Sequence, residues 1–440
     1  MKKTALPVNV LLAAAVSAAV CCTAFASDSA PDSVPSAAEP VMSSAEAAEE
    51  EYVPADPDAA WLSEYFNVAF EDDVTADAFN DALTDMGGEA VEADPFTLAD
   101  AVTGAVRLAG MEELALTYES DAAMQKAEEI LRDNNISAEE AYEPYIACAL
   151  DLGLADSSWD FDGGISASQA TAMLAKAAGL NGTGRHYIGR ISDPDILEKI
   201  CTVLSETIIF DNEELTDLGD QLVLDGAVTG YGLKYSGSDA RFLEENTLKY
   251  SHSELRHAEQ LIGLLKSEGF DGYVQIEPKL SVYEYMADWG DPGDPTPTYA
   301  VIEVEENRML AYAVEYDLMI EFENTDEKES FHGLIEDYAK KYDSSFDEDG
   351  NLTAKLLDGS WWQPLYSSVT EMENEEYVRL TDNIVYNSAG DYSIHTFTLP
   401  ENAAAVAEAV GEIAPDLTAG EKTIYVNPAF YRYISGEDYQ

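Results

Sequence analysis

The sequence predicts a multidomain α+β protein in which an all-α region of helical repeats precedes a C-terminal domain of antiparallel sheet and helices. The chain has 440 residues, too many to surround one hydrophobic core. Apolar residues recur with helical spacing through residues 61–250, whereas residues 273–285 alternate with the period of a strand. We therefore expect a signal segment over 1–26, a tether over 27–60, helical repeats over 61–250 and an α+β domain over 251–440.

The N-terminus is typical of a secretory signal peptide. Lys2 and Lys3 supply positive charge, residues 5–19 are mostly apolar, and residues 24–26 read Ala-Phe-Ala, a small-x-small cleavage site. We expect cleavage there and a mature protein that is secreted, extracellular or associated with the cell wall, without a transmembrane segment. An uncleaved anchor, or a lipoprotein signal at Cys21 or Cys22, is the alternative.

The segment after the signal peptide, from Ser27 to about Asp58, is rich in Ser, Ala, Pro and acidic residues. It has almost no large apolar side chains, so it cannot bury enough surface to fold and should be a disordered tether. The rest of the chain keeps Cys148 and Cys201, each within an apolar helical stretch. Buried free thiols are therefore expected in place of a disulfide.

The composition is strongly acidic, with 86 Asp and Glu against 23 Lys and Arg. Such a surface repels nucleic acid and anionic lipid, which excludes both as partners. We expect no cofactor other than Ca²⁺ held weakly by clustered carboxylates. The segment 343–351 resembles the start of an EF-hand, but its twelfth loop position falls at Leu356, so a helix-to-strand turn explains it better and no dedicated metal site is expected.

One phrase recurs in the helical region: a polar N-cap, an apolar helix and a glycine near the helix end. A hydroxyl residue followed three positions later by an acid or amide is the signature of a capping box. The pairs are Thr97 with Asp100, Ser166 with Gln169, and Ser251 with Glu254. The second and third are capping boxes proper, and the first is a near match.

The middle copy, residues 142–180, has a first helix ending near Gly153, an Asp/Gly-rich loop and a capped second helix. This layout resembles an S-layer homology (SLH) repeat, the module with which many bacterial surface proteins hold cell-wall polymer. The family phrase I-T-R-A-E carries an arginine associated with polymer binding. The matching positions here are Leu98, Ala167 and His252, so the repeats resemble the family framework without its arginine.

The resemblance implies a non-catalytic bacterial surface protein whose partner is cell-wall polymer or another surface glycan or protein. The third copy keeps the most polar and aromatic groups, and its candidate polymer-binding residues are Tyr250, His252, Glu254, Arg256 and Tyr231. The alternative is that the phrases are generic capped helices in an all-α bundle. His252 and His257 do not suggest a metal site, because residues five apart do not share a helix face.

The C-terminal half reads as antiparallel hairpins with interleaved helices. Residues 273–285 form a strand that Pro278 should break or bulge, and residues 299–322 form a hairpin. The order helix, strand, hairpin, helix, strand resembles a ferredoxin-like arrangement. Further expected elements are a helix at 326–342, a strand at 352–357, a helix at 373–380, a hairpin over 383–398, a helix at 401–414 and a strand at 422–426.

An aromatic cluster, Trp361, Trp362 and Tyr366, is the candidate ligand-binding site of this half, because exposed rings beside polar groups suit sugar stacking or peptide docking. The same rings could instead be core residues. No catalytic motif is present and only 5 histidines occur, so no catalytic residue is assigned. A glycan-binding module or enzyme acting through the aromatic cluster is the alternative function. His186 lies in a short basic segment, residues 182–190, that could hold an anion or form a loop.

Overall fold

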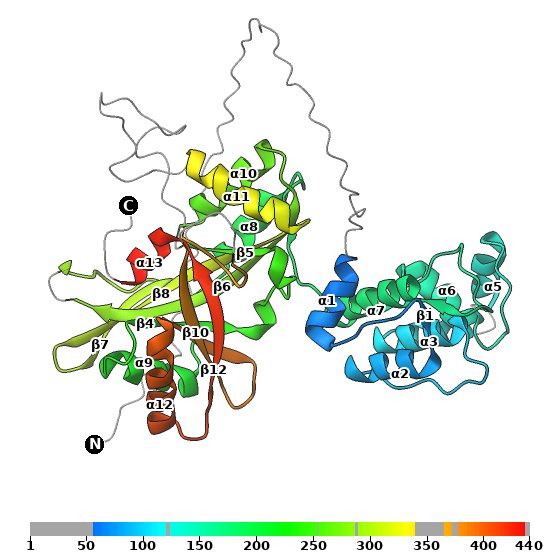
Figure 1. Cartoon of the computed structure of the whole chain (residues 1–440), viewed down its shortest axis with the longest axis horizontal. Helices are drawn as coiled ribbons and strands as arrows, with labels where there is room; N and C mark the ends of the chain where they lie inside the picture. Colours follow the sequence, from blue (N-terminus) through cyan, green and yellow to red (C-terminus); the bar gives the residue numbers. More distant parts are fainter. Residues whose placement is uncertain are drawn as a thin grey trace, which may run out of the picture. The chain divides into compact units, whose positions relative to one another are not determined.

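The computed structural model describes residues 56–119, 124–252, 254–286, 289–338, 365–371 and 377–435. The expected signal segment, nearly all of the tether, the acidic segment 343–351 and the pair Trp361–Trp362 lie outside these residues. No helix in the described residues has the length and apolar character needed to cross a membrane. The described chain forms a helical region and a β-barrel region, coloured blue to cyan and green to red in Figure 1.

The helical region is confirmed as mainly α-helical up to residue 181. Its two short strands, β1 and β2, pair antiparallel. Its elements are α1 (Pro57–Phe66), β1 (Asp73–Val74), α2 (Ala76–Asp85), α3 (Leu98–Leu108), α4 (Glu112–Leu116), α5 (Met124–Asp133), α6 (Glu143–Leu152), β2 (Ile165–Ser166) and α7 (Ala167–Asn181).

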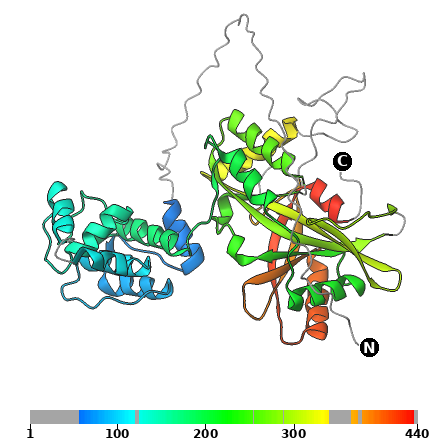
Figure 2. The same ribbon diagram turned by 180° about the vertical axis from the view of Figure 1, so that it is seen from behind.

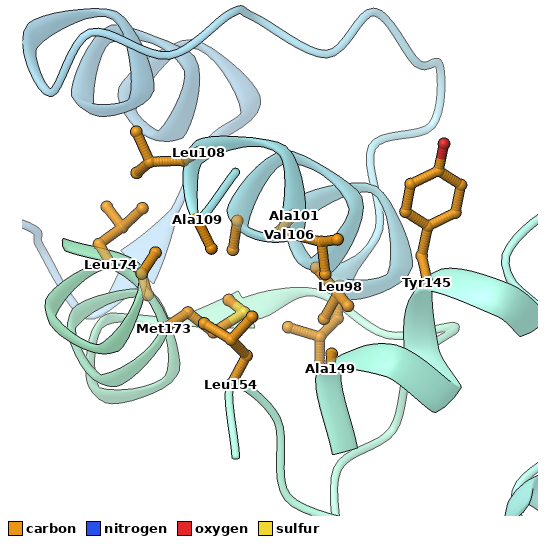
Figure 3. Close-up of a cluster of buried hydrophobic side chains, with 14 of the residues drawn as sticks. Leu98, Ala101, Val106, Leu108, Ala109, Tyr145, Ala149, Leu154, Met173 and Leu174 are labelled. Carbon is orange, nitrogen blue, oxygen red and sulfur yellow. The ribbon is translucent and has the colours of Figure 1, made fainter. Parts of the chain in front are cut away.

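The core of this region lies around α3, of whose residues only Arg107 is not buried. Figure 3 shows labelled side chains of α3, among them Leu98 and Leu108, and of α7, Met173 and Leu174, in one apolar cluster. Gly104 allows α3 to approach α2 closely, because a Cβ there would lie 2.7 Å from Cδ1 of Leu83. The repeat helices therefore share one continuous apolar core.

Two of the three predicted caps are confirmed. The Gln169 N–H donates to Oγ of Ser166 at 3.3 Å and the Ser166 N–H donates to Oε1 of Gln169 at 3.0 Å, which is a reciprocal capping box. At the start of α3, the Thr97 N–H donates to the Asp100 carboxylate at 2.9 Å. These three bonds satisfy N–H groups that have no partner within the helix at its N-terminus.

The third predicted cap, at Ser251, is wrong. Ser251 lies within a strand, β5 (Thr247–His252), and α10 (Leu255–Ser267) begins after Glu254 without a side-chain cap. The Ser251 hydroxyl donates instead to Oδ1 of Asp317 at 2.7 Å. Ser251 therefore pairs within the sheet and bonds a buried carboxylate, although the local motif predicts a helix N-cap at this residue.

Ten strands form the sheet of the second region (Figures 1 and 2). The order β6-β4-β11-β10-β12-β9-β5-β8 closes by pairing of β8 with β6, which makes an eight-stranded antiparallel barrel; β3 and β7 are the two extra strands. The bounds are β3 (Gly189–Arg190), β4 (Gly230–Tyr235), β5, β6 (Gly272–Tyr285), β7 (Tyr299–Glu305), β8 (Arg308–Phe322), β9 (Tyr366–Ser368), β10 (Val378–Tyr386), β11 (Tyr392–Thr398) and β12 (Ala419–Val426).

The predicted α+β domain with a ferredoxin-like sheet is therefore wrong. Strands β4 and β5 come from residues 230–252, which the sequence assigned to helical repeats, and β4 pairs with β11 near the other end of the chain. Residues 378–380, expected in a helix, begin β10. Helical spacing of apolar residues is a local signal, whereas barrel closure depends on pairings distant in sequence that local patterns do not reveal.

Pro278 does not break its strand. β6 continues through it, and Pro278 lies between the stretch that pairs with β3 at residues 273–274 and the stretch that pairs with β4 at residues 279–283. At this position β6 has only β8 as a neighbour. Proline is tolerated at such edge-like positions because a ladder hydrogen bond is not required on both sides.

Helices cover the outer face of the barrel. The set is α8 (Ile196–Ser205), α9 (Glu213–Leu224), α10, α11 (Thr325–Tyr338) and α12 (Ala403–Ile413), whereas α13 (Pro428–Ile434) packs against the inner face. Apolar residues at even positions of β6 and β8 pack under them: Ile276 and Ile320 lie in one core with α8, α10 and α11, and Leu280 and Leu310 lie in another with α9 and α12. Figure 1 shows these two groups of helices at opposite ends of the sheet.

The interior contains one apolar cluster. Leu380 and Ile424 are partners in the β10–β12 ladder, and they pack with Val426 and with Phe430 of α13. These strand residues alternate with Val385, which belongs to the outer core under α9 and α12. α13 therefore covers an apolar section of the inner face, and charged and polar side chains line much of the remainder.

The outer apolar face should carry most of the barrel's stability. Ile320 on β8 is 0% exposed and Ile302 on β7 is 49% exposed, so the two give a matched pair of substitutions. Ile320→Ala should lower the free energy of unfolding by about 2–5 kcal/mol, and Ile302→Ala by less than about 1 kcal/mol. Urea unfolding of both variants measures this, and equal losses would contradict the burial assigned to β8.

Candidate functional site

The interior of the barrel is polar where α13 does not cover it. On β6 most residues that alternate with the apolar outer positions are charged or polar, as are Glu315, Asp317 and Glu321 on β8, and the register places those of neighbouring strands side by side. This interior cluster comprises Lys234 on β4, Lys249 and Ser251 on β5, Glu277 and Lys279 on β6, Asp317 on β8, Asp382 on β10, and Ser393 and His395 on β11.

Asp317 is the centre of the interior cluster. Its carboxylate accepts hydrogen bonds from Nζ of Lys279 at 2.6 Å and from Nζ of Lys234 at 3.0 Å. The hydroxyl of Ser251 adds a third bond, and Nζ of Lys249 lies 3.7 Å away. Burial by itself would raise the pKa of Asp317, but the three ammonium groups outweigh burial and hold that pKa well below its usual range.

Lys234 connects Asp317 to a second carboxylate. Its Nζ donates to Oε2 of Glu277 at 2.5 Å, and Oε1 of Glu277 accepts the N–H of Ala240 at 2.8 Å. Burial disfavours the Lys234 ammonium, but Glu277 and Asp317 outweigh burial and raise its pKa. Lys234 and Glu277 therefore each pair with a group of opposite charge, as buried ions require.

Lys249 is less well satisfied. Within the described part of the chain, the carboxylate of Asp317 at 3.7 Å is the one acidic group recorded within 4.0 Å of its Nζ, and that separation is too long for a hydrogen bond. Burial, followed by the charge of Lys234, lowers the pKa of Lys249, although Asp317 and Glu277 oppose this. Lys249 thus presents N–H donors to the interior without a recorded acceptor among the described residues.

Asp382 lacks a hydrogen-bond donor to one carboxylate oxygen within the described part of the chain. Its Oδ2 accepts from Nδ1 of His395 at 2.8 Å, while Oδ1 has no hydrogen-bond partner among the residues that the structure describes. The residue is only 3% exposed, so bulk water does not readily supply the missing donor. Asp382 also interacts electrostatically with Lys249. Among the described residues, the interior cluster therefore contains a donor, Nζ of Lys249, and an acceptor, Oδ1 of Asp382, that have no recorded hydrogen bond and that interact electrostatically with each other.

A hydrogen-bonded chain extends from Asp382 through His395 to Ser393. Nε2 of His395 lies 3.0 Å from Oγ of Ser393. An ionised carboxylate only accepts hydrogen bonds, so it assigns the proton of a neutral His395 ring to Nδ1, and Nε2 then accepts from the serine hydroxyl. The structure thus places a serine, a histidine and an aspartate in the order of a nucleophile, its base and the group that orients the base.

The predicted polymer-binding residues do not lie together: two are buried in the outer cores and three lie at the end of β5 and the start of α10. Tyr231 and Tyr250 are both buried on the outer face of the barrel, in the core with α9 and in the core with α10 respectively. His252 ends β5, and its Nε2 lies 2.8 Å from Nδ1 of His257. Glu254 and Arg256 are exposed at the start of α10. Burial, then the charges of His257 and Lys279, lower the pKa of His252 to about 3.

Burial or direct partners account for the other residues that the sequence singled out. Tyr366 is a buried core residue whose ring packs edge-on against Phe331, with centroids 5.4 Å apart. Cys148 is a buried free thiol, as predicted, whereas Cys201 is half-buried and its Sγ donates to Oε1 of Glu259 at 2.8 Å. In the basic segment 182–190, Arg190 pairs with the carboxylate of Asp271 at 3.0 Å, so at least this cation is already neutralised.

Sequence reasoning missed the interior cluster entirely. Its one signal was the alternation of Glu277 and Lys279 with Ile276 and Leu280 on β6. In an open sheet such charged positions face water, so the pattern predicts a solvated face. Only closure of the barrel turns the same face inward and brings Asp317 of β8 against lysines of three other strands.

No group of three or more His, Cys, Asp or Glu side chains among the described residues is arranged to hold a metal ion. Comparison with protein-family models, with curated proteins and with solved structures gave no match. The class of protein that fold and site define is therefore an antiparallel barrel with a charged interior, joined to a helical region, and its function must be argued from the interior cluster.

Asp317→Asn should lower the free energy of unfolding at neutral pH by about 3–5 kcal/mol, because it leaves buried ammonium groups without their carboxylate. The pKa of Asp317 is depressed in the folded protein, so its stabilisation is present above the ordinary pKa of aspartate and is lost as pH falls through the depressed value. Variant and parent should therefore converge in stability on acidification.

Urea unfolding from neutral to acidic pH measures both effects of Asp317→Asn. Asp294→Asn, at an exposed loop position, is the matched control and should change the free energy of unfolding by less than about 0.5 kcal/mol. A similar loss in both variants would show that the interior cluster does not stabilise the barrel.

Proposed function

We propose that this protein is a secreted bacterial surface protein whose barrel binds a small polar ligand carrying both an anionic group and a hydroxyl or amino donor. The observation that supports the ligand is the pair of incompletely satisfied groups, Lys249 and Asp382, on the inner face. The anionic group would accept from Lys249, and the donor would bond Oδ1 of Asp382.

A purely structural role explains this pair poorly. Most buried polar side chains in folded proteins have hydrogen-bond partners, and leaving one without a partner costs about 1–3 kcal/mol. Asp317, Lys234 and Glu277 in the same interior cluster do have partners. Oδ1 of Asp382 is thus a buried acceptor without a partner among the described residues, and Lys249, whose side chain is 24% exposed, is a nearby cation that a ligand with both functions could also satisfy.

The charge of the protein narrows the ligand class. A formal net charge of −63 opposes the approach of multiply charged anions. A zwitterion or a singly charged hydroxy acid avoids most of this repulsion and still offers an acceptor to Lys249. The ligand class that fits is therefore amino acids, hydroxy acids and amino sugars that carry one carboxylate.

Isothermal titration calorimetry of the mature chain against such a panel tests this function. Lys249→Gln should weaken binding of any ligand found by roughly 10–100-fold, since a hydrogen bond to a charged group is lost. Lys266→Gln, at an exposed position of α10, is the control and should leave affinity unchanged. No binding across the panel, or equal affinity in Lys249→Gln, would contradict the proposal.

The second part of the proposal is association with the cell wall through the helical repeats. It is supported by the signal-peptide pattern and by the SLH-like phrases, two of which have the expected capped helices. The polymer-binding residues proposed are Tyr250, His252, Glu254, Arg256 and Tyr231. Because both tyrosines are buried, His252, Glu254 and Arg256 are the members with accessible polar groups.

Sedimentation of the mature chain with purified wall sacculi tests this association. The protein should co-sediment with sacculi that retain their polymer and stay in solution after acid has stripped the polymer. His252→Ala should reduce co-sedimentation if the third phrase binds. Protein that remains soluble with intact sacculi would exclude wall association and leave the barrel as the functional part.

The alternative function is a glycan-binding module or enzyme acting through Trp361, Trp362 and Tyr366. Tyr366 is buried in the core under α10 and α11, so its ring face is not available to a sugar. The alternative therefore depends on the two tryptophans, which lie outside the described residues.

A further inference from the structure

The binding proposal does not use Ser393 or His395, yet these residues form the most specific chemical arrangement in the barrel. Oγ of Ser393 lies 3.0 Å from Nε2 of His395, and Nδ1 of His395 lies 2.8 Å from Oδ2 of Asp382. These separations lie within the range for a nucleophile bonded to its base and a base bonded to its orienting carboxylate.

The arrangement follows from the barrel register. Ser393 and His395 are two residues apart on β11, so their side chains share the inner face. The partner of His395 on β10 is Ile384, which places Asp382 diagonally across the strand pair and within reach of a long side chain. The alternation that builds the interior cluster thus also aligns the three groups.

We infer that Ser393 is an activated nucleophile and that the barrel hydrolyses a small ester. Oγ attacks the carbonyl carbon and gives its proton to Nε2 of His395. The carbon–oxygen bond to the leaving group then breaks, and the departing alkoxide takes that proton. Water attacks the acyl-serine, His395 removes its proton and returns it to Oγ, and the acid is released. The sum is ester plus water giving acid plus alcohol.

Lys234 is the group that can stabilise the developing oxyanion. It is the direct partner of Ser393 in the β4–β11 ladder, so both side chains project from adjacent points of the inner face. An ammonium group has three N–H donors, and two of them are directed at Glu277 and Asp317. The third is available for the carbonyl oxygen as its negative charge increases.

The exposures of these groups define the substrate size. Ser393 is 4% exposed and the His395 side chain is 17% exposed, so the nucleophile is the more deeply buried of the two groups. Only a slender acyl group can reach Oγ, which selects short-chain esters over peptides or long-chain lipids. This inference is independent of the ligand proposed for Lys249.

Two probes test the nucleophile on the full mature chain: hydrolysis of p-nitrophenyl acetate, and labelling by diisopropyl fluorophosphate read by intact mass and peptide mapping. Labelling forms a phosphorus–oxygen bond at Oγ, and fluoride leaves with the serine proton by way of His395. The expected label is on Ser393.

The matched control is Ser367, which is 4% exposed like Ser393 but lies on β9 and is not part of the chain to His395. Ser367→Ala should react like the parent, Ser393→Ala should lose the label, and His395→Gln should react about 10²–10⁴-fold more slowly while keeping the serine. Circular dichroism and urea unfolding confirm that each variant is folded.

The inference is overturned if the folded parent protein neither hydrolyses the ester nor takes up the label. It is equally overturned if the label maps to another residue, or if His395→Gln reacts at the parental rate. A parent protein that hydrolyses the ester but does not react with the bulkier diisopropyl fluorophosphate still supports the inference when Ser393→Ala abolishes hydrolysis.

Discussion

The attraction between Asp317 and its three lysines is the interaction on which the barrel most depends. Lys234, Lys249 and Lys279 come from β4, β5 and β6, and Asp317 comes from β8, so four strands that are neighbours around the barrel meet at one carboxylate. Removing charges from water is costly unless they find one another. The register that pairs them is therefore strongly preferred over its neighbours, because a slip of one residue would place the lysines under the apolar helices.

The same constraint explains why the polar face lies inside. Each long strand carries an apolar face and a charged face, and both must be accommodated. The helices α8 to α12 bury the apolar face from outside, and the charged faces of several strands satisfy one another within. Lys249 and Asp382 have fewer hydrogen bonds than their neighbours among the described residues, and for that reason the proposed ligand is placed against them.

The helical region depends on a different kind of interaction. Its caps at Thr97 and Ser166 form between residues three apart, and its core joins small and branched side chains of consecutive helices. Such contacts are local, so they could be read from the sequence as capped, amphipathic helices. Ser251 carries the same local signature but does not cap a helix. It pairs with β8 and its hydroxyl bonds the Asp317 carboxylate, and these interactions are more favourable there than a helix cap.

The sequence by itself determined the mainly helical character of the chain up to residue 181, two helix caps, the free thiol of Cys148, and the presence of a long alternating strand over 273–285. It could not determine which face of those strands meets water, because alternation is identical for an open sheet and a closed barrel. It also could not bring Ser393 to Asp382 or Lys234 to Asp317, whose proximity depends on strand register. Only the tertiary structure decided these matters, since barrel closure joins residues 230–235 to residues 392–398 and converts a face expected to be solvated into a buried charged interior.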